Sequence, residues 1–195
     1  ELHNYRGIFG SHLANVLRRL KRVARFYGAN PQFILCTATI ANPVEVAERM
    51  IEEPVALIAD NGAPRGEKFF IFYTPPVVNK FLGIRRSYIN EAQRVAAVFL
   101  RNNLQTIVFA QSRLNTEVLL TYIKDDIETA IQKEGLIRGY RGGYLPLKRR
   151  EIEKGLREGS ILGVVSTNAL ELGIDIGSLD VAVLAGYPGT IASTW

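Results

Sequence analysis

The residues best suited to chemistry lie in one short stretch, residues 166–177, directly after an apolar run that is typical of a buried strand. Open parallel α/β sheets bind their ligands beyond the carboxyl ends of the strands. Thr167 and Asn168 can cap a helix here, and its N-terminal N–H groups would suit a phosphate. Gly173 lets the backbone approach a ligand, and Asp175 offers an acceptor for a sugar hydroxyl. These properties fit a nucleotide or nucleic-acid site and an ordinary capped helix equally well.

The elements that must position this stretch alternate between helices and apolar strands, which indicates a parallel α/β sheet. Helical spacing predicts helices over residues 7–27, 42–51, 88–101 and 147–158, and a long helix that begins after Ser112. Short apolar runs predict buried strands at Phe33–Cys36, Val55–Ile58, Phe69–Tyr73, Thr106–Ala110, Ile161–Val165 and Val181–Ala185. Residues 60–66 are dense in turn formers, so we expect a linker there between two α/β units.

The start of the second helix carries a capping signal. Asn42 can accept hydrogen bonds from free backbone N–H groups, and Pro43 fits the first turn. Glu45 is placed to reach back to the cap, as in a capping box.

Composition limits the class of protein. The chain has 195 residues, 47% of them hydrophobic and 22% charged, as in a globular rather than a disordered protein. No run of about 18 apolar residues is present, which argues against a membrane-spanning helix. Cys36 is the only cysteine, so an internal disulfide and a cysteine-based zinc cluster are excluded, and its apolar run predicts an inert core position. This usage suits the reducing cytoplasm.

Basic residues outnumber acidic ones by 24 to 19, which suits a nucleic-acid partner without establishing one. One basic group on the first helix is expected to be a solvated face: Arg18, Arg19, Lys21, Arg22 and Arg25. A second group lies beside two glycines, Gly142 and Gly143, and phosphate contact and simple exposure stay equally open for it: Arg141, Lys148, Arg149 and Arg150. Tyr140 and Tyr144 beside them either stack on bases or pack in the core.

The stretch at residues 166–177 resembles motif V of superfamily 2 helicases. A Thr-x-Ala-x-Glu-x-Gly-Ile-Asp pattern characterises that motif, and it is present from Thr167 to Asp175. The resemblance implies that Thr167 contacts the nucleic-acid backbone and that Gly173 and Asp175 face the nucleotide.

Further segments resemble helicase motifs in the family's order. Glu1-Leu2-His3 is similar to the end of a DExH box, Thr37-Ala38-Thr39 to motif III and residues 107–113 to motif IV. Residues 140–144 resemble the segment that contacts the strand in relatives. By this resemblance the nucleic-acid-binding residues are Ser112, Arg113, Arg141, Gly142 and Thr167, and the ATP-binding and coupling residues are Thr37, Thr39, Gly173 and Asp175.

The chemistry of phosphoryl transfer explains the residue types of the DExH box. The reaction needs a metal ion on the phosphates and a group that orients the attacking water. In this family the box Asp acts on Mg²⁺ and the Glu handles water. Glu1 inherits the second role, and His3 links the nucleotide site to motif III, so these two are the expected catalytic residues. The implied cofactors are ATP and Mg²⁺, with no metal ligand inside the chain. Without the resemblance, His3 would be an ordinary exposed histidine, and Thr37 and Thr39 ordinary strand-end caps.

A finer resemblance connects the chain to the MrfA-like DExH helicases, the bacterial mitomycin-repair type that is related to fungal RecQ-like repair helicases. It rests on residues 5–12, 38–43 and 141–146, and similarity covers essentially the whole chain. It implies DNA as the partner, as a single strand or tailed duplex, with RNA as an alternative. It also implies 3′ to 5′ movement and a zinc-binding region outside these residues. Separately, we expect a cytoplasmic monomer without membrane contact.

The resemblance implies an α/β fold of two incomplete RecA-like lobes, each a mostly parallel sheet flanked by helices. Residues 1–66 would be the C-terminal part of lobe 1, and residues 67–195 the N-terminal part of lobe 2. The chain would be an internal fragment of an ATP-dependent helicase that couples hydrolysis to strand movement. It has neither the Gly-x-x-x-x-Gly-Lys-Ser/Thr phosphate loop nor the arginine-rich motif VI, so these residues alone should be inactive.

Two other classes of function compete. A non-catalytic nucleic-acid-binding module of RecA-like halves would use the same surfaces without hydrolysis. A nucleotide-binding α/β enzyme acting on small molecules fits the fold, but it explains neither motif IV nor the spacing from Thr167 to Asp175.

Overall fold

The computed structural model describes residues 2–37, 40–60, 62, 66–167, 176–177, 179–189 and 194. They divide into two compact units with a boundary between Phe69 and Phe70, and each unit has its own core. Within the described part of the chain, no helix has the length and apolar character to cross a membrane.

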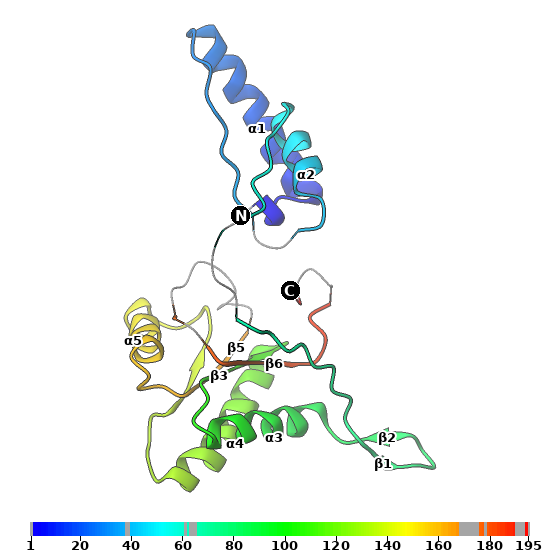
Figure 1. The fold of residues 1–195 in the computed structure, drawn as a ribbon, viewed down its shortest axis with the longest axis vertical. Helices are drawn as coiled ribbons and strands as arrows, with labels where there is room; N and C mark the ends of the chain where they lie inside the picture. The colour runs from blue at the N-terminus through cyan, green and yellow to red at the C-terminus, as the bar shows by residue number, and fades with distance from the viewer. Residues whose placement is uncertain are drawn as a thin grey trace. The chain divides into compact units, whose positions relative to one another are not determined.

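The first unit contains a 3₁₀ turn at Leu2–Asn4 and two helices, α1 (Gly7–Phe26) and α2 (Pro43–Ile51) (Figure 1). Both helices were predicted, and α1 ends just before Gly28, whose φ of 73° suits glycine. The two helices pack through a small apolar core of Leu2, Ala14, Ala47, Met50 and Ile51.

Lys21 also connects the two helices. Its ammonium group donates to the carbonyl of Ile51 at 2.5 Å and pairs with Glu53 at 2.5 Å, and the residue is buried. A cation at the C-terminus of a helix is favourable because the last carbonyls carry partial negative charge. The expectation that Lys21 belongs to a solvated basic face was therefore wrong, because α2 ends against it.

The predicted capping box does not form. The Asn42 side chain makes no cap hydrogen bond; its amide donates instead to the Glu45 carboxylate at 2.7 Å. Pro43 does occupy the first turn, as expected.

Three of the predicted strands are not strands: residues 33–36, 55–58 and 69–73 form no sheet ladder. Ile34 is 84% exposed, and Cys36 is exposed rather than buried in a core. A strand is stabilised by the backbone groups of a neighbouring strand, and the described residues of the first unit include no such partner. The apolar pattern was therefore not sufficient to predict a strand, because hydrophobicity does not specify a partner strand.

The second unit is built on a parallel sheet with strand order β4-β5-β3-β6 (Figure 1). Its strands are β3 (Thr106–Ala110), β4 (Ile137–Tyr140), β5 (Gly163–Ser166) and β6 (Val181–Ala185). All three pairings are parallel. The parallel α/β class is confirmed for this unit, and β3 and β6 have the predicted bounds.

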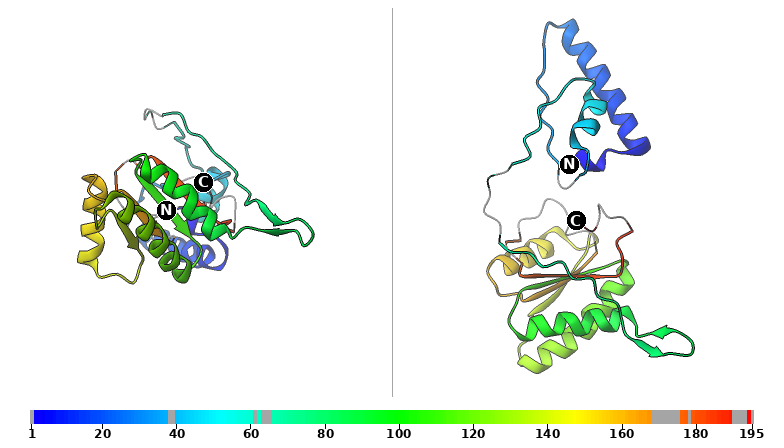
Figure 2. Two further views of the ribbon diagram at one scale, coloured as in Figure 1. Left: turned by 90° about the horizontal axis from the view of Figure 1, so that it is seen from below. Right: turned by 45° about the vertical axis from the view of Figure 1, so that its right-hand side comes forward.

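Helices cover both faces of this sheet. α3 (Tyr88–Arg101) and α4 (Arg113–Ile131) lie on one face, and α5 (Pro146–Arg157) lies on the other (Figures 1 and 2). Successive residues of a strand point to opposite faces, so Val108 joins the core under α3 and α4 while Ile107 joins the core under α5.

A short antiparallel hairpin precedes α3 and was not predicted. It consists of β1 (Val77–Asn79) and β2 (Ile84–Arg85). Asn79 and Gly83 are turn-forming residues that could have signalled it.

Candidate functional site

The segments that follow strands β3, β4 and β5 all begin at one edge of the sheet. Ser166 lies opposite Phe109 on one side and opposite Tyr140 on the other. Because these strands are parallel, the segments after them leave the sheet at the same carboxyl edge. This edge therefore brings together the segments that carry the predicted residues Ser112, Arg113, Arg141, Gly142 and Thr167.

Ser112 caps α4, as the sequence predicted. Its Oγ accepts a hydrogen bond from the backbone N–H of Asn115 at 3.1 Å. Arg113 is the first residue of the helix and is exposed. The cap explains Ser112 fully, so its role toward nucleic acid stays a prediction. The preceding residue, Gln111, donates to the carbonyl of Tyr187 at 2.6 Å and joins the segment after β3 to the segment after β6.

The segment after β4 places two cations on one aromatic ring. The Arg141 guanidinium lies 5.2 Å from the centre of the Tyr144 ring, and the Lys148 ammonium lies 4.7 Å from it. Arg141 Nε is buried and lies 3.3 Å from a Glu117 carboxylate oxygen, in an ion pair without hydrogen-bond geometry. We call Arg141, Tyr144 and Lys148 the Tyr144 group. Paired cations of this kind suit a phosphate.

Gly142 stands beside the Tyr144 group with open space around it. A Cβ built on Gly142 would meet no atom of the described residues within 4 Å, and Gly142 is exposed. The backbone is therefore accessible to a ligand at this position, as the sequence predicted on the basis of the glycine.

Tyr140 and Tyr144, on either side of Gly142 and Gly143, differ in burial and in their contacts. Tyr140 is buried, and its hydroxyl donates to Glu153 at 2.8 Å. Burial, assisted by Glu153, raises the pKa of Tyr140 to about 12. Tyr140 is therefore a core residue, whereas Tyr144 is half-buried and carries the two cations. Tyr144 also packs against the core under α5, so packing is observed for both tyrosines and base stacking stays a prediction.

Motif V is described only at its beginning. Ser166 is buried, and its hydroxyl donates to the carbonyl of Thr167 at 2.6 Å. Asn168, Gly173 and Asp175 lie outside the described residues. Their predicted contacts with a nucleotide therefore stay predictions.

The first unit brings together two predicted residues that are 34 positions apart. His3 Nδ1 lies 3.3 Å from Thr37 Oγ1, and the backbone N–H of Leu2 donates to the carbonyl of Cys36 at 2.9 Å. The segment that resembles the DExH box therefore lies alongside the segment that resembles motif III. Glu1 and Thr39 are outside the described residues.

Metal ligands are not grouped in the described part of the chain. No set of three or more His, Cys, Asp or Glu side chains there could hold a metal ion.

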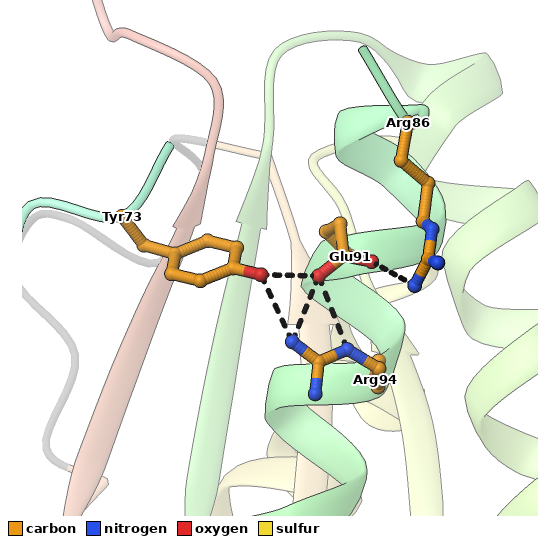
Figure 3. Close-up of polar contacts among 4 residues, drawn as sticks. All are labelled: Tyr73, Arg86, Glu91 and Arg94. Carbon is orange, nitrogen blue, oxygen red and sulfur yellow. Dashed lines mark hydrogen bonds and ion pairs between the residues drawn. The ribbon is translucent and has the colours of Figure 1, made fainter. Parts of the chain in front are cut away.

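A polar cluster that the sequence did not reveal lies at the start of α3. The Glu91 side chain is 2% exposed, and Tyr73 lies 2.6 Å from one of its oxygens (Figure 3). Arg94 donates to the same oxygen at 2.9 and 3.1 Å, and Arg86 donates to the other at 2.8 Å. We call these four residues the Glu91 cluster. The signal for it in the sequence was the spacing of Glu91 and Arg94, one helical turn apart in the helix predicted over residues 88–101.

The Glu91 cluster predicts a specific acid sensitivity. The hydrogen bonds from Tyr73 and then Arg94 lower the pKa of Glu91 from 4.5 to about 2, against the effect of burial. A lowered pKa contributes stability that is present above about pH 4.5 and is lost as the pH falls toward 2. We expect Glu91→Gln to lower the melting temperature at pH 7 and to reduce the difference from wild type at pH 3. Thermal unfolding at pH 7, 4 and 3 measures this, and parallel pH curves would remove the ionic role of Glu91.

The parallel sheet with helices on both faces defines a doubly wound α/β unit, and its solved structural neighbours are RecA-like helicase domains. The helicase conserved C-terminal domain family matches residues 90–195, which is more than half of the chain. The chain belongs to this helicase family.

Individual relatives confirm the resemblance to MrfA-like helicases and their fungal counterparts. The uncharacterized ATP-dependent helicase YprA of Bacillus subtilis is 60% identical over 195 residues, which are 100% of this chain and 26% of that protein. The ATP-dependent helicase HRQ1 of Saccharomyces cerevisiae is 39% identical over 200 residues, covering 99% of this chain and 18% of that protein.

A solved structure extends this similarity to the fold. The crystal structure of the DUF1998 helicase MrfA bound to DNA and AMPPNP is 60% identical, with a TM-score of 0.91, and the match covers 100% of this chain and 27% of that one. The chain thus spans about a quarter of the length of YprA and MrfA, and less of HRQ1.

Proposed function

We propose that the chain is part of an ATP-dependent DNA helicase, with residues 1–66 and 67–195 belonging to two successive RecA-like lobes. The observation that carries this proposal is the shared carboxyl edge of the second sheet, where the Tyr144 group lies with the segments of Ser112 and Thr167. The likeness to a helicase whose structure contains DNA and AMPPNP supports it.

We propose that residues at the carboxyl edge of the sheet bind the sugar-phosphate backbone of a DNA strand. Arg141 and Lys148 contact phosphates, and the open space at Gly142 lets a phosphate reach the backbone N–H groups. Tyr144 holds the two cations in place through their contact with its ring. Thr167 provides a further backbone contact at the end of β5.

The nucleotide side of the proposal rests on other residues. Glu1 orients the attacking water, and Gly173 and Asp175 face the nucleotide. The His3–Thr37 pair, at 3.3 Å, relates the DExH-like segment to motif III and so couples the nucleotide state to the rest of the unit. Bound Mg²⁺ would neutralise charge on the phosphates. We also propose that the protein acts as a monomer in the cytoplasm.

The decisive experiment is an ATPase assay of the full-length protein with and without single-stranded DNA. We expect DNA to stimulate hydrolysis. Arg141→Ala should weaken DNA binding roughly tenfold or more, because a hydrogen bond to a charged group contributes about 1.5–3 kcal/mol. It should also reduce the salt dependence of binding by about one counterion, with basal hydrolysis unchanged.

The matched control is Lys154→Ala, which removes an exposed cation from α5 that pairs with Glu158 and lies outside the Tyr144 group. Equal effects of the two substitutions would contradict a specific phosphate contact at Arg141. DNA binding by the wild type without any hydrolysis would favour the non-catalytic binding module instead. Competition with RNA of the same length tests the preference for DNA.

A further inference from the structure

The β1-β2 hairpin presents an apolar tip to solvent. Phe81 is fully exposed and Leu82 is 72% exposed. Figures 1 and 2 show the hairpin extending away from the sheet and helices of its own unit. Phe81 and Leu82 are adjacent, so together they present apolar surface at the tip of an ordered element, where a partner can contact it.

The hairpin is held in a defined shape, although isolated two-stranded hairpins are only marginally stable. In the turn, the backbone N–H of Leu82 donates to the Asn79 side chain at 3.1 Å, and Gly83 adopts a φ of 63°. At the base, the N–H of Arg86 donates to the carbonyl of Pro76 at 2.9 Å. The Arg86 side chain joins the Glu91 cluster and so fixes the base to α3 (Figure 3).

Between Glu67 and Glu91, the charged residues of the hairpin and its flanks are all basic. Residues 68–90 contain Lys68, Lys80, Arg85 and Arg86 and no aspartate or glutamate. Arg85 donates to the carbonyl of Pro75, and Arg86 pairs with Glu91, so Lys80 is the cation next to the exposed ring. An aromatic ring beside a cation, without nearby acids in sequence, complements a single-stranded nucleic acid, which offers both base faces and phosphates.

We propose that residues 77–85 form an additional contact for single-stranded DNA, in which Phe81 stacks on a base and Lys80 contacts an adjacent phosphate. This inference rests on the proposed helicase function, and it adds a surface separate from the carboxyl edge of the sheet. Charge complementarity favours DNA over an apolar protein partner, since residues 77–85 contain Lys80 and Arg85 and no aspartate or glutamate.

The test uses the full-length protein with Phe81→Ala, and fluorescence anisotropy with a labelled oligothymidine and with an abasic strand of equal length. Loss of stacking should weaken binding of oligothymidine roughly fivefold or more, because stacking on one base has that effect by alanine substitution. Binding of the abasic strand should not change. Phe81→Trp should retain the affinity. Phe26→Ala, which removes an aromatic residue that is 82% exposed at the end of α1, serves as the matched control.

Four other results of these experiments would contradict the proposed DNA contact of the hairpin. Unchanged DNA affinity of Phe81→Ala, with DNA-stimulated hydrolysis intact, overturns the hairpin contact and leaves the helicase proposal standing. Equal weakening for both strands overturns the stacking. A lower melting temperature without any loss of DNA affinity means that the tip packs on another part of the full-length protein. A wild-type protein that binds no DNA overturns both proposals.

Discussion

Glu1→Gln in the full-length protein is expected to leave ATP binding intact and to lower hydrolysis by roughly 100-fold or more, the usual contribution of a positioned acid or base. The proposal gives this carboxylate the task of orienting the attacking water, and an amide of the same size cannot accept the proton that the water loses. Nucleotide affinity should be preserved, because the substitution removes no contact with the phosphates in this scheme. Equilibrium nucleotide binding and steady-state phosphate release measure the two quantities separately.

Glu48→Gln provides the control for this prediction. Glu48 lies on an exposed position of α2, and the same change there should alter neither quantity. Normal turnover in Glu1→Gln would remove Glu1 from the role that the DExH resemblance gives it. Loss of nucleotide binding in Glu1→Gln would instead indicate that the residue contacts the nucleotide or its metal.

Leu119→Ala is expected to destabilise the second unit by about 2–5 kcal/mol, the usual range for removing a large apolar side chain from a core. Leu119 is 0% exposed on α4 and packs in the core between this helix and the sheet. Since α4 also positions Ser112 at the carboxyl edge, DNA binding should fall as the unit unfolds. Chemical denaturation of the chain, followed by circular dichroism, gives the change in free energy of unfolding.

Leu114→Ala is the matched control on the same helix. Leu114 is 72% exposed, so the same substitution should change the free energy of unfolding by no more than about 0.5 kcal/mol. Similar losses at the two positions would mean that the buried face of α4 differs from the one described.

The sequence predicted the second unit well because its signals are local. Helical spacing located α3, and continuous apolar runs located β3 and β6. β3 is buried on both faces, as such a run predicts, whereas β6 at the edge of the sheet is only partly buried. Ser112 was recognised as a cap from its position before an apolar helix. The order of the motifs was sufficient to indicate the helicase family.

The same reasoning was wrong where structure depends on a partner that is distant in sequence. Residues 33–36 and 55–58 have the apolar character of buried strands, yet strand formation requires a neighbour, and hydrophobicity does not specify one. Lys21 was assigned to solvent because its own helix gives no indication that the end of α2 lies against it.

For the candidate site, too, some features were predictable from the sequence and others only from the tertiary structure. Residue types and spacing in the sequence determined the family, the class of ligand and the segments that carry the chemistry. The tertiary structure decided that Tyr140 is a core residue while Tyr144 holds two cations, and that Tyr73 meets Glu91 across 18 positions. The physical reason is that periodicity reports only which face of an element is apolar. Side-chain partners depend on how several elements pack, and no local pattern records that arrangement.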